Sequence, residues 1–190
     1  MYDKQAGTYT VTIKQSCPPT PGQPVKKPFH IPVAVGLLGK DGKELILKTD
    51  AGTIKTDAGT RGHGDTGTIT LEMKKAEQTF VFTGIPEEPV PSILRGFSAP
   101  VKVQLDLSDD ERLFLMANDN DPFNRWDAGQ QFAVRLILDL VKDHQEGRPL
   151  LLDNLFIDAY RKTLESDMND KAFQAYALSL PTETYLADFM

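Results

Sequence analysis

The run Val101-Lys-Val-Gln-Leu-Asp-Leu107 is followed directly by Ser108-Asp-Asp-Glu111. Apolar and polar residues alternate in the first run, which is the period of a half-buried β-strand. In the second run, Ser108 and Glu111 have the spacing of a capping box, and two aspartates stand where the positive end of a helix dipole would lie. We therefore predict that a β-structured unit ends here and that a helical unit begins.

The composition changes at the same place. The residues up to Asp106 include 22 Gly or Pro and carry a net charge of +2, whereas the other 84 residues include 5 Gly or Pro and carry −8. Turn residues between short apolar stretches are typical of strands, and charged stretches without breakers are typical of helices. We predict an all-β domain over residues 1–106 followed by an all-α domain over residues 107–190.

Short stretches with strand character recur along the first domain. They cover residues 9–16, 29–38, 44–48, 68–73, 77–83, 93–97 and 101–107. Seven short strands in about 100 residues suggest an immunoglobulin-like β-sandwich. We further predict an exposed, extended loop at the prolines of residues 17–24 and a flexible hairpin tip between Thr49 and Gly67.

Helical patterns fill the second domain. Helices are predicted over residues 109–117, from Pro122 to the breaker Gly147, over 153–166, over 171–180, and from Thr182 onward. Asp121 has the position of an N-cap before Pro122. The last helix carries apolar residues at helical spacing up to Met190, so its apolar face is still incomplete there. That pattern indicates the beginning of a larger helical array.

Residues able to support catalysis are few and scattered. His30, His63 and His144 are predicted on a strand, a loop and a helix, and the sequence has no His-Glu-x-x-His motif. Cys17 is the single cysteine and stands among prolines, without the partner or setting of a nucleophile or metal ligand. We therefore assign no catalytic, cofactor-binding or metal-binding residue to the chain.

Two acidic clusters have alternative interpretations. The run Asn118-Asp-Asn-Asp121 gathers oxygen ligands, as a calcium site would, but an EF-hand needs Gly and Glu where Asn124 and Gln130 stand. Residues 109–111 could form a pair of carboxylates for acid–base chemistry, but adjacent residues at a helix start are expected to be solvated. We predict that both clusters cap helices.

Charge and hydropathy exclude several classes of protein. The chain has a net charge of −6 and an isoelectric point near 5.1, which argues against binding nucleic acid. No apolar run approaches the roughly 20 residues needed to cross a bilayer, and the first residues lack the pattern of a signal peptide. We expect a cytoplasmic protein without a membrane partner.

Four longer stretches carry a family resemblance. They are Phe29-His-Ile-Pro32, Gln78-Thr-Phe-Val-Phe82, Pro89-Val-Pro-Ser-Ile-Leu-Arg-Gly-Phe-Ser-Ala-Pro-Val-Lys102 and Asn118-Asp-Asn-Asp-Pro-Phe-Asn-Arg-Trp-Asp-Ala-Gly-Gln130. In their order and spacing they resemble the bacterial type of the zinc aminopeptidase N (alanyl aminopeptidase) family, over nearly the whole chain.

The resemblance implies a non-catalytic segment of a metalloprotease that removes N-terminal residues from peptides. Its immunoglobulin-like sandwich and the start of its helical domain would follow the catalytic domain, bridge it to the remaining helical domain, and help shape substrate access. The zinc ligands and catalytic residues of the family would lie upstream, so this chain would hold no cofactor and have no activity alone. With part of the array missing, we expect the isolated chain to self-associate through its terminal helix.

Two other functions are compatible with some of these features. A free-standing β-sandwich binding module would hold a peptide or protein partner with its Pro-rich loop or a sheet edge. A reading frame that continues on both sides would favour the enzyme segment instead. A self-contained hydrolase is disfavoured because the sequence offers neither a nucleophile–base pair nor a metal-ligand set.

Overall fold

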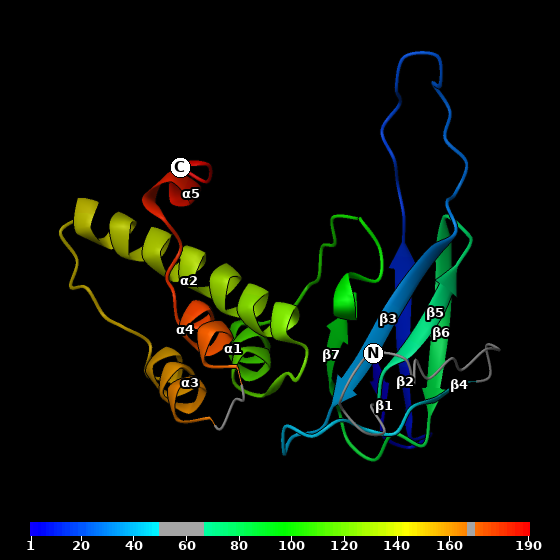
Figure 1. The fold of residues 1–190 in the computed structure, drawn as a ribbon, viewed down its shortest axis with the longest axis horizontal. Helices are drawn as coiled ribbons and strands as arrows, with labels where there is room; N and C mark the ends of the chain where they lie inside the picture. Colours follow the sequence, from blue (N-terminus) through cyan, green and yellow to red (C-terminus); the bar gives the residue numbers. More distant parts are fainter. Residues whose placement is uncertain (50–66, 167–169) are drawn as a thin grey trace. The chain divides into compact units, whose positions relative to one another are not determined.

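The structure is a computed structural model that describes residues 1–49, 67–166 and 170–190 (Figure 1). By its internal contacts the chain divides into a sheet unit, Met1–Lys102, and a helical unit, Val103–Met190. Strands occupy the first unit and helices the second, as the composition predicts. The two units are described separately.

Two antiparallel sheets make up the described part of the sheet unit. The first has the order β1 (Tyr2–Asp3), β2 (Thr8–Lys14), β6 (Glu77–Thr83), β4 (Lys48–Thr49). The second has the order β5 (Ile69–Met73), β3 (Ile31–Leu38), β7 (Val90–Ile93). Alternate residues are buried along β5 and β6, as expected for strands with one face toward a core.

The central strand β3 is buried along most of its length, from Val33 to Leu38. Pro32 precedes this buried stretch and lies opposite Glu72 of β5. On its other side, β7 pairs with β3 only from Val35 onward. Pro32 therefore occupies a local sheet edge, where its missing N–H costs no ladder hydrogen bond, as the sequence predicts.

Three strand predictions are wrong in whole or in part. Residues 101–107 form no strand and are mostly exposed. Residues 93–97 contain only the end of β7, after which a short 3₁₀ turn, Arg95–Phe97, follows. Residues 44–48 contribute a single bridge from Glu44 to Leu38 and the first residue of β4. Alternation shows which residues could face a core, but a strand also needs a partner, and that partner is non-local.

The two predicted loops have different outcomes. Residues 17–24 are exposed, as expected, and the dark-blue loop containing them extends beyond the ends of β2 and β3 (Figure 1). The predicted hairpin tip lies mostly outside the described residues. At the other end of β3, the turn Gly39–Gly42 closes with Gly42 at φ 78°, the conformation for which its glycine was predicted.

Five helices form the described part of the helical unit. They are α1 (Asp109–Asn118), α2 (Pro122–Gln145), α3 (Asn154–Glu165), α4 (Lys171–Ala177) and α5 (Glu183–Ala187). The capping box is present, because the Ser108 hydroxyl accepts from the Glu111 amide at 3.2 Å and the Ser108 amide donates to the Glu111 carboxylate at 2.7 Å. α4 ends three residues before the predicted position.

The core of the helical unit lies between α1, α2 and α3. Its buried members are Leu113 and Met116 of α1, Phe132 of α2 and Ala159 of α3. Along α3, Ala159 and Thr163 are buried, whereas Leu164 is exposed. The Thr163 hydroxyl can be buried because it donates to the Met116 carbonyl.

Candidate functional site

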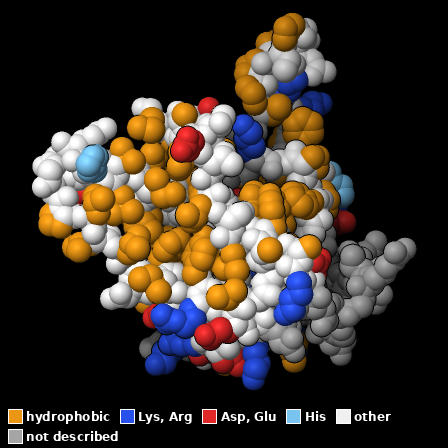
Figure 2. All heavy atoms as spheres, turned by 60° about the vertical axis from the view of Figure 1, so that its left-hand side comes forward, with side chains coloured by type: hydrophobic (Ala, Val, Ile, Leu, Met, Phe, Trp, Pro, Cys, Tyr) orange, Lys and Arg blue, Asp and Glu red, His pale blue; other side chains and the backbone are white. Residues whose placement is uncertain are grey.

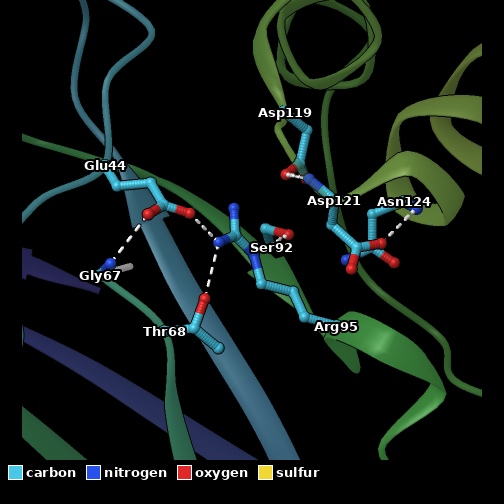
Figure 3. A network of polar contacts seen from close by, with 8 residues as sticks. All are labelled: Glu44, Gly67, Thr68, Ser92, Arg95, Asp119, Asp121 and Asn124. Atoms are coloured by element: carbon cyan, nitrogen blue, oxygen red, sulfur yellow. Dashed lines mark hydrogen bonds and ion pairs between the residues drawn. The ribbon is translucent and has the colours of Figure 1, made fainter. Parts of the chain in front are cut away.

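A buried arginine, which follows the end of β7, connects several segments of the sheet unit. Arg95 is 5% exposed, and its Nε donates to the Ser92 hydroxyl at 2.8 Å (Figure 3). Its Nη1 donates to the Thr68 hydroxyl at 2.9 Å and forms an ion pair with Glu44. The second Glu44 oxygen accepts from the Gly67 amide at 2.8 Å. One guanidinium thus joins segments that are far apart in the sequence.

This arginine also explains a glycine in the middle of β3. A Cβ on Gly36 would lie 2.4 Å from the central carbon of the Arg95 guanidinium. Such a distance is far inside van der Waals contact, and the arginine is held by its hydrogen bonds and cannot withdraw at low cost. The close approach therefore requires glycine at this position.

The turn that carries Arg95 has an unusual backbone. Leu94 and Phe97 have φ values of 60° and 53°, and Gly96 between them has 60°. The left-handed conformation costs a residue with a Cβ about 1–2 kcal/mol. Such residues persist where surrounding contacts fix them, and here the Arg95 bonds and the Ser98 hydroxyl, which accepts from the Ala34 amide, fix the turn.

The corner between α1 and α2 is a second polar cluster, in the helical unit. Asp119 accepts from the Asp121 amide at 3.0 Å, and Asp121 accepts from the Asn124 amide at 2.9 Å (Figure 3). Pro122 is the first residue of α2. The aspartates therefore bind backbone amides as helix caps do, which confirms the capping prediction.

Arg125 closes the end of α1 from the next helix. Its Nε donates to the Met116 carbonyl at 2.8 Å and its Nη2 to the Ala117 carbonyl at 3.2 Å, so a cation meets the negative end of the α1 dipole. Burial lowers the pKa of Arg125 below its ordinary value, and the Asp119 carboxylate opposes that shift. The side chain remains a cation and serves to fix the α1–α2 corner.

An open cleft lies beside this corner. Its lining comprises Ala117, Arg125, Asp158, Arg161, Lys162, Glu165 and Ser166. Asp158 and Arg161 pair with each other at 2.6 Å, and Lys162 donates to the Asn118 side chain at 2.5 Å. Because the lining carries charges of both signs, the cleft offers no single-sign field for a charged ligand.

The residues considered for catalysis in the sequence lie apart from these clusters. His30, His144 and Cys17 are exposed, and His63 lies outside the described residues. Within residues 1–49, 67–166 and 170–190, no group of three His, Cys, Asp or Glu is placed to hold a metal ion. The same part of the chain contains no helix both long and apolar enough to cross a membrane.

Sequence reasoning missed the structural roles of the two buried arginines. Arg95 carried a usable signal, because it is the one charge in the otherwise uncharged run from Pro89 to Val101. A charge in such a run is either exposed or buried with partners. Arg125 had no comparable signal, since the residues around it at the start of the helix are a mixture of polar, charged and aromatic ones.

Comparison with known families identifies the chain. Residues 1–106 match the domain of unknown function (DUF3458) with an Ig-like fold, and residues 109–190 match its companion DUF3458_C, described as ARM repeats. The chain belongs to the DUF3458 family. This match confirms the predicted fold class, an immunoglobulin-like domain followed by part of a helical array.

The relatives of this DUF3458 chain are bacterial aminopeptidases. It is 36% identical over 187 residues to aminopeptidase N of Escherichia coli K12 and 32% identical over 188 residues to that of Haemophilus influenzae; each alignment covers 98% of this chain and 20% of the relative. Aminopeptidase N of Caulobacter vibrioides is 40% identical over 155 residues, which are 81% of this chain and 15% of the relative.

A solved structure agrees with these alignments. The crystal structure of Legionella pneumophila aminopeptidase A in complex with aspartic acid has a TM-score of 0.72 and 25% identity, and covers all of this chain but 19% of its own. The resemblance to aminopeptidase N is therefore confirmed. The DUF3458 chain spans about a fifth of the length of these relatives and corresponds to one segment of them.

Proposed function

We propose that the chain is a non-catalytic segment of a cytoplasmic, zinc-dependent aminopeptidase of the N type. In this proposal the sandwich, residues 1–106, bridges the catalytic domain and the remaining helical domain. Residues 107–190 begin the helical array that limits substrate access. The observation that carries the proposal is that the chain aligns along almost its entire length with one segment of aminopeptidases.

An uncovered apolar surface in the helical unit supports this role. The buried residues of α2 end at Val134, although five of the next seven residues are aliphatic. The connection to α3 then exposes three successive leucines, Leu150–Leu152. We call the half-buried aliphatic side chains of α2 beyond Leu136, together with these leucines and Leu155, the apolar band: Ile137, Leu138, Leu140, Val141, Leu150, Leu151, Leu152 and Leu155.

Figure 2 shows hydrophobic side chains gathered across the helical part of the molecule that faces the viewer. The terminal helix α5 likewise has no buried residue. ARM-type repeats bury their apolar faces against neighbouring repeats and cannot do so alone. The apolar band has the character of a face that further helices of the same enzyme would cover.

The donor atoms of the described residues do not form a zinc site. A catalytic zinc site needs three protein ligands of the His, Glu or Cys type in one place. Among the described residues no such group occurs, and His30 and His144 belong to different units. We therefore assign the zinc and the catalytic groups of the proposed enzyme to regions outside these 190 residues, and derive no chemical step from this chain.

An activity assay tests the proposal. The 190-residue chain, supplied with zinc, is expected not to hydrolyse alanyl-p-nitroanilide, whereas the protein encoded by the complete reading frame is expected to do so and to lose activity with a chelator. Hydrolysis by the 190-residue chain that persists through a second purification would contradict the proposal. A complete reading frame without a peptidase domain would favour the binding module.

A further inference from the structure

The Pro-rich finger, residues 15–29, is ordered at its base by a single side chain. The Gln15 carboxamide accepts from the Phe29 amide at 2.8 Å and donates to the Phe29 carbonyl at 2.9 Å. It also donates to the carbonyl of Lys75, a residue of the turn between β5 and β6, at 3.0 Å. The Gln15 side chain therefore makes the pair of backbone contacts that a neighbouring strand residue would make. It holds the two ends of the finger together and joins them to the sheet unit.

The tip of the finger is closed as well. Thr20 and Gln23 exchange two backbone hydrogen bonds around Pro21 and Gly22, and Gly22 has φ 79°. Lys26 donates to the side chains of both Thr20 and Gln23, at 2.6 and 2.5 Å. The remaining prolines fix φ between tip and base, so the finger has little conformational freedom to lose.

This ordered finger buries almost nothing. All its residues from Ser16 to Phe29 are exposed except Lys26, which is half-buried, and the Val25 side chain is 83% exposed. Its hydrogen bonds hold the finger in a fixed conformation, yet the finger buries almost no apolar surface against the sheet unit. A rigid, exposed, extended segment is instead suited to binding, because its ordering cost has already been met.

We propose that the Pro-rich finger is a docking arm that inserts into an aromatic-lined groove elsewhere in the same, longer polypeptide. Extended proline segments bind between aromatic rings, and their carbonyls accept from Tyr and Trp donors. Val25 supplies an apolar contact. Lys27, next to the internally bound Lys26, supplies a cation that would pair with an acidic group at the rim of such a groove.

The size of the finger decides in favour of the same polypeptide over a separate protein. A stable complex between separate proteins uses roughly 20–30 residues on each side, more than residues 15–29 provide. Within one chain, the high effective concentration allows a small contact to be occupied. The relatives supply the setting, since their chains continue for about four-fifths of their length beyond the matched segment. The inference therefore rests on the proposed function.

Thiol labelling of the full-length protein tests the docking. Cys17 lies in the finger, and Lys43→Cys places a control thiol in the turn at the other end of β3. Each thiol is reacted with N-ethylmaleimide, identified by peptide mass spectrometry, and normalised to its rate in concentrated urea. We expect Cys17 to react at least about tenfold more slowly than the control thiol, because a docked finger excludes the reagent.

Two matched variants give the test its specificity. Val25→Asp is expected to restore Cys17 labelling to within about twofold of the control thiol, whereas Ile46→Asp, at a position 80% exposed in the same unit, is expected to leave the protection intact. Equal labelling of Cys17 and the control thiol would overturn the proposal, as would protection that survives Val25→Asp. Protection that disappears on dilution would assign the groove to another molecule and overturn it too.

Activity measurements distinguish a failure of this inference from a failure of the proposed function. Aminopeptidase activity is measured on the same protein samples that are used for labelling. A fully active protein with an unprotected Cys17 refutes the docking arm alone. An inactive protein with a protected Cys17 refutes the proposed function alone.

Discussion

Among the single-residue substitutions considered, we expect the largest loss of stability from breaking the ion pair between Arg95 and Glu44. Glu44→Gln removes the negative charge that pairs with the buried Arg95 guanidinium. We expect the free energy of unfolding to fall by about 3 kcal/mol, the usual cost of breaking a buried pair from one side. Urea denaturation measures it. The control is Glu77→Gln at the exposed Lys14–Glu77 pair, with an expected loss below about 1 kcal/mol. Equal losses in the two variants would contradict a buried pair.

Asp127, on α2, should make stability depend on pH. Burial raises the pKa of Asp127 above its ordinary value, and a hydrogen bond from Gln131 opposes this shift. The folded state therefore holds this proton more tightly than the unfolded state, and the ionised carboxylate costs stability at neutral pH. Asp127→Asn, which keeps an acceptor for Gln131, is expected to raise the free energy of unfolding at pH 7.

The stabilisation by Asp127→Asn should shrink as the pH falls through the raised pKa and vanish below the unfolded value, where both states of the wild-type carboxyl are protonated. Urea titrations at several pH values measure it. Asp139→Asn, at an exposed position on the same helix, is the control for removing a negative charge from α2. A gain that is independent of pH would refute burial of the charge as its cause.

Among the elements, α1 depends most visibly on its first residue. Ser108→Ala removes the hydroxyl that accepts from the Glu111 amide. The helical unit is then expected to lose about 1 kcal/mol of unfolding free energy. Thermal or urea unfolding followed by far-UV circular dichroism measures the loss. Ser108→Thr retains an acceptor oxygen and should lose much less; a loss as large as that of alanine would show that the hydroxyl is not the cause.

Elements encoded by adjacent residues were predictable, and those that need distant partners were not. The capping box, the Asp121 cap and the strand Glu77–Thr83 follow from local spacing, and the structure confirms them. Residues 101–107 alternate equally well but form no strand. Arg95 binds Glu44 and Thr68, and neither the periodicity nor the spacing of the sequence indicates that these residues lie next to it. Long-range pairing therefore limited the prediction.

The Pro-rich finger shows the same limit in a loop. Its exposure and extension follow from its prolines, and the structure confirms both. The clamp at its base does not follow from them, because Gln15 is an ordinary polar residue at the end of a strand and its partners are 14 and 60 residues away. Composition thus predicted an exposed loop, but only the structure indicated that hydrogen bonds hold this loop in one conformation.

At the scale of the whole chain, charge and apolar surface act in opposition. The net charge of −6 repels copies of the chain from one another, while the apolar band and the exposed residues of α5 favour association. We expect the isolated chain to self-associate weakly, with an average mass above 21.1 kDa that rises with concentration. Salt near 1 M should strengthen association because it screens the repulsion but not the apolar contact.

Sedimentation velocity measures this association and locates it. Leu151→Glu places a charge at a residue of the apolar band that is 75% exposed, and should return the average mass toward that of a monomer. Val25→Glu makes the same chemical change at a comparably exposed residue of the sheet unit and should leave the mass unchanged. A wild-type chain that stays monomeric at all concentrations would contradict the prediction. If both variants reduced the mass equally, added charge alone would be the cause, and the apolar band would not be the face that neighbouring helices cover in the proposed enzyme.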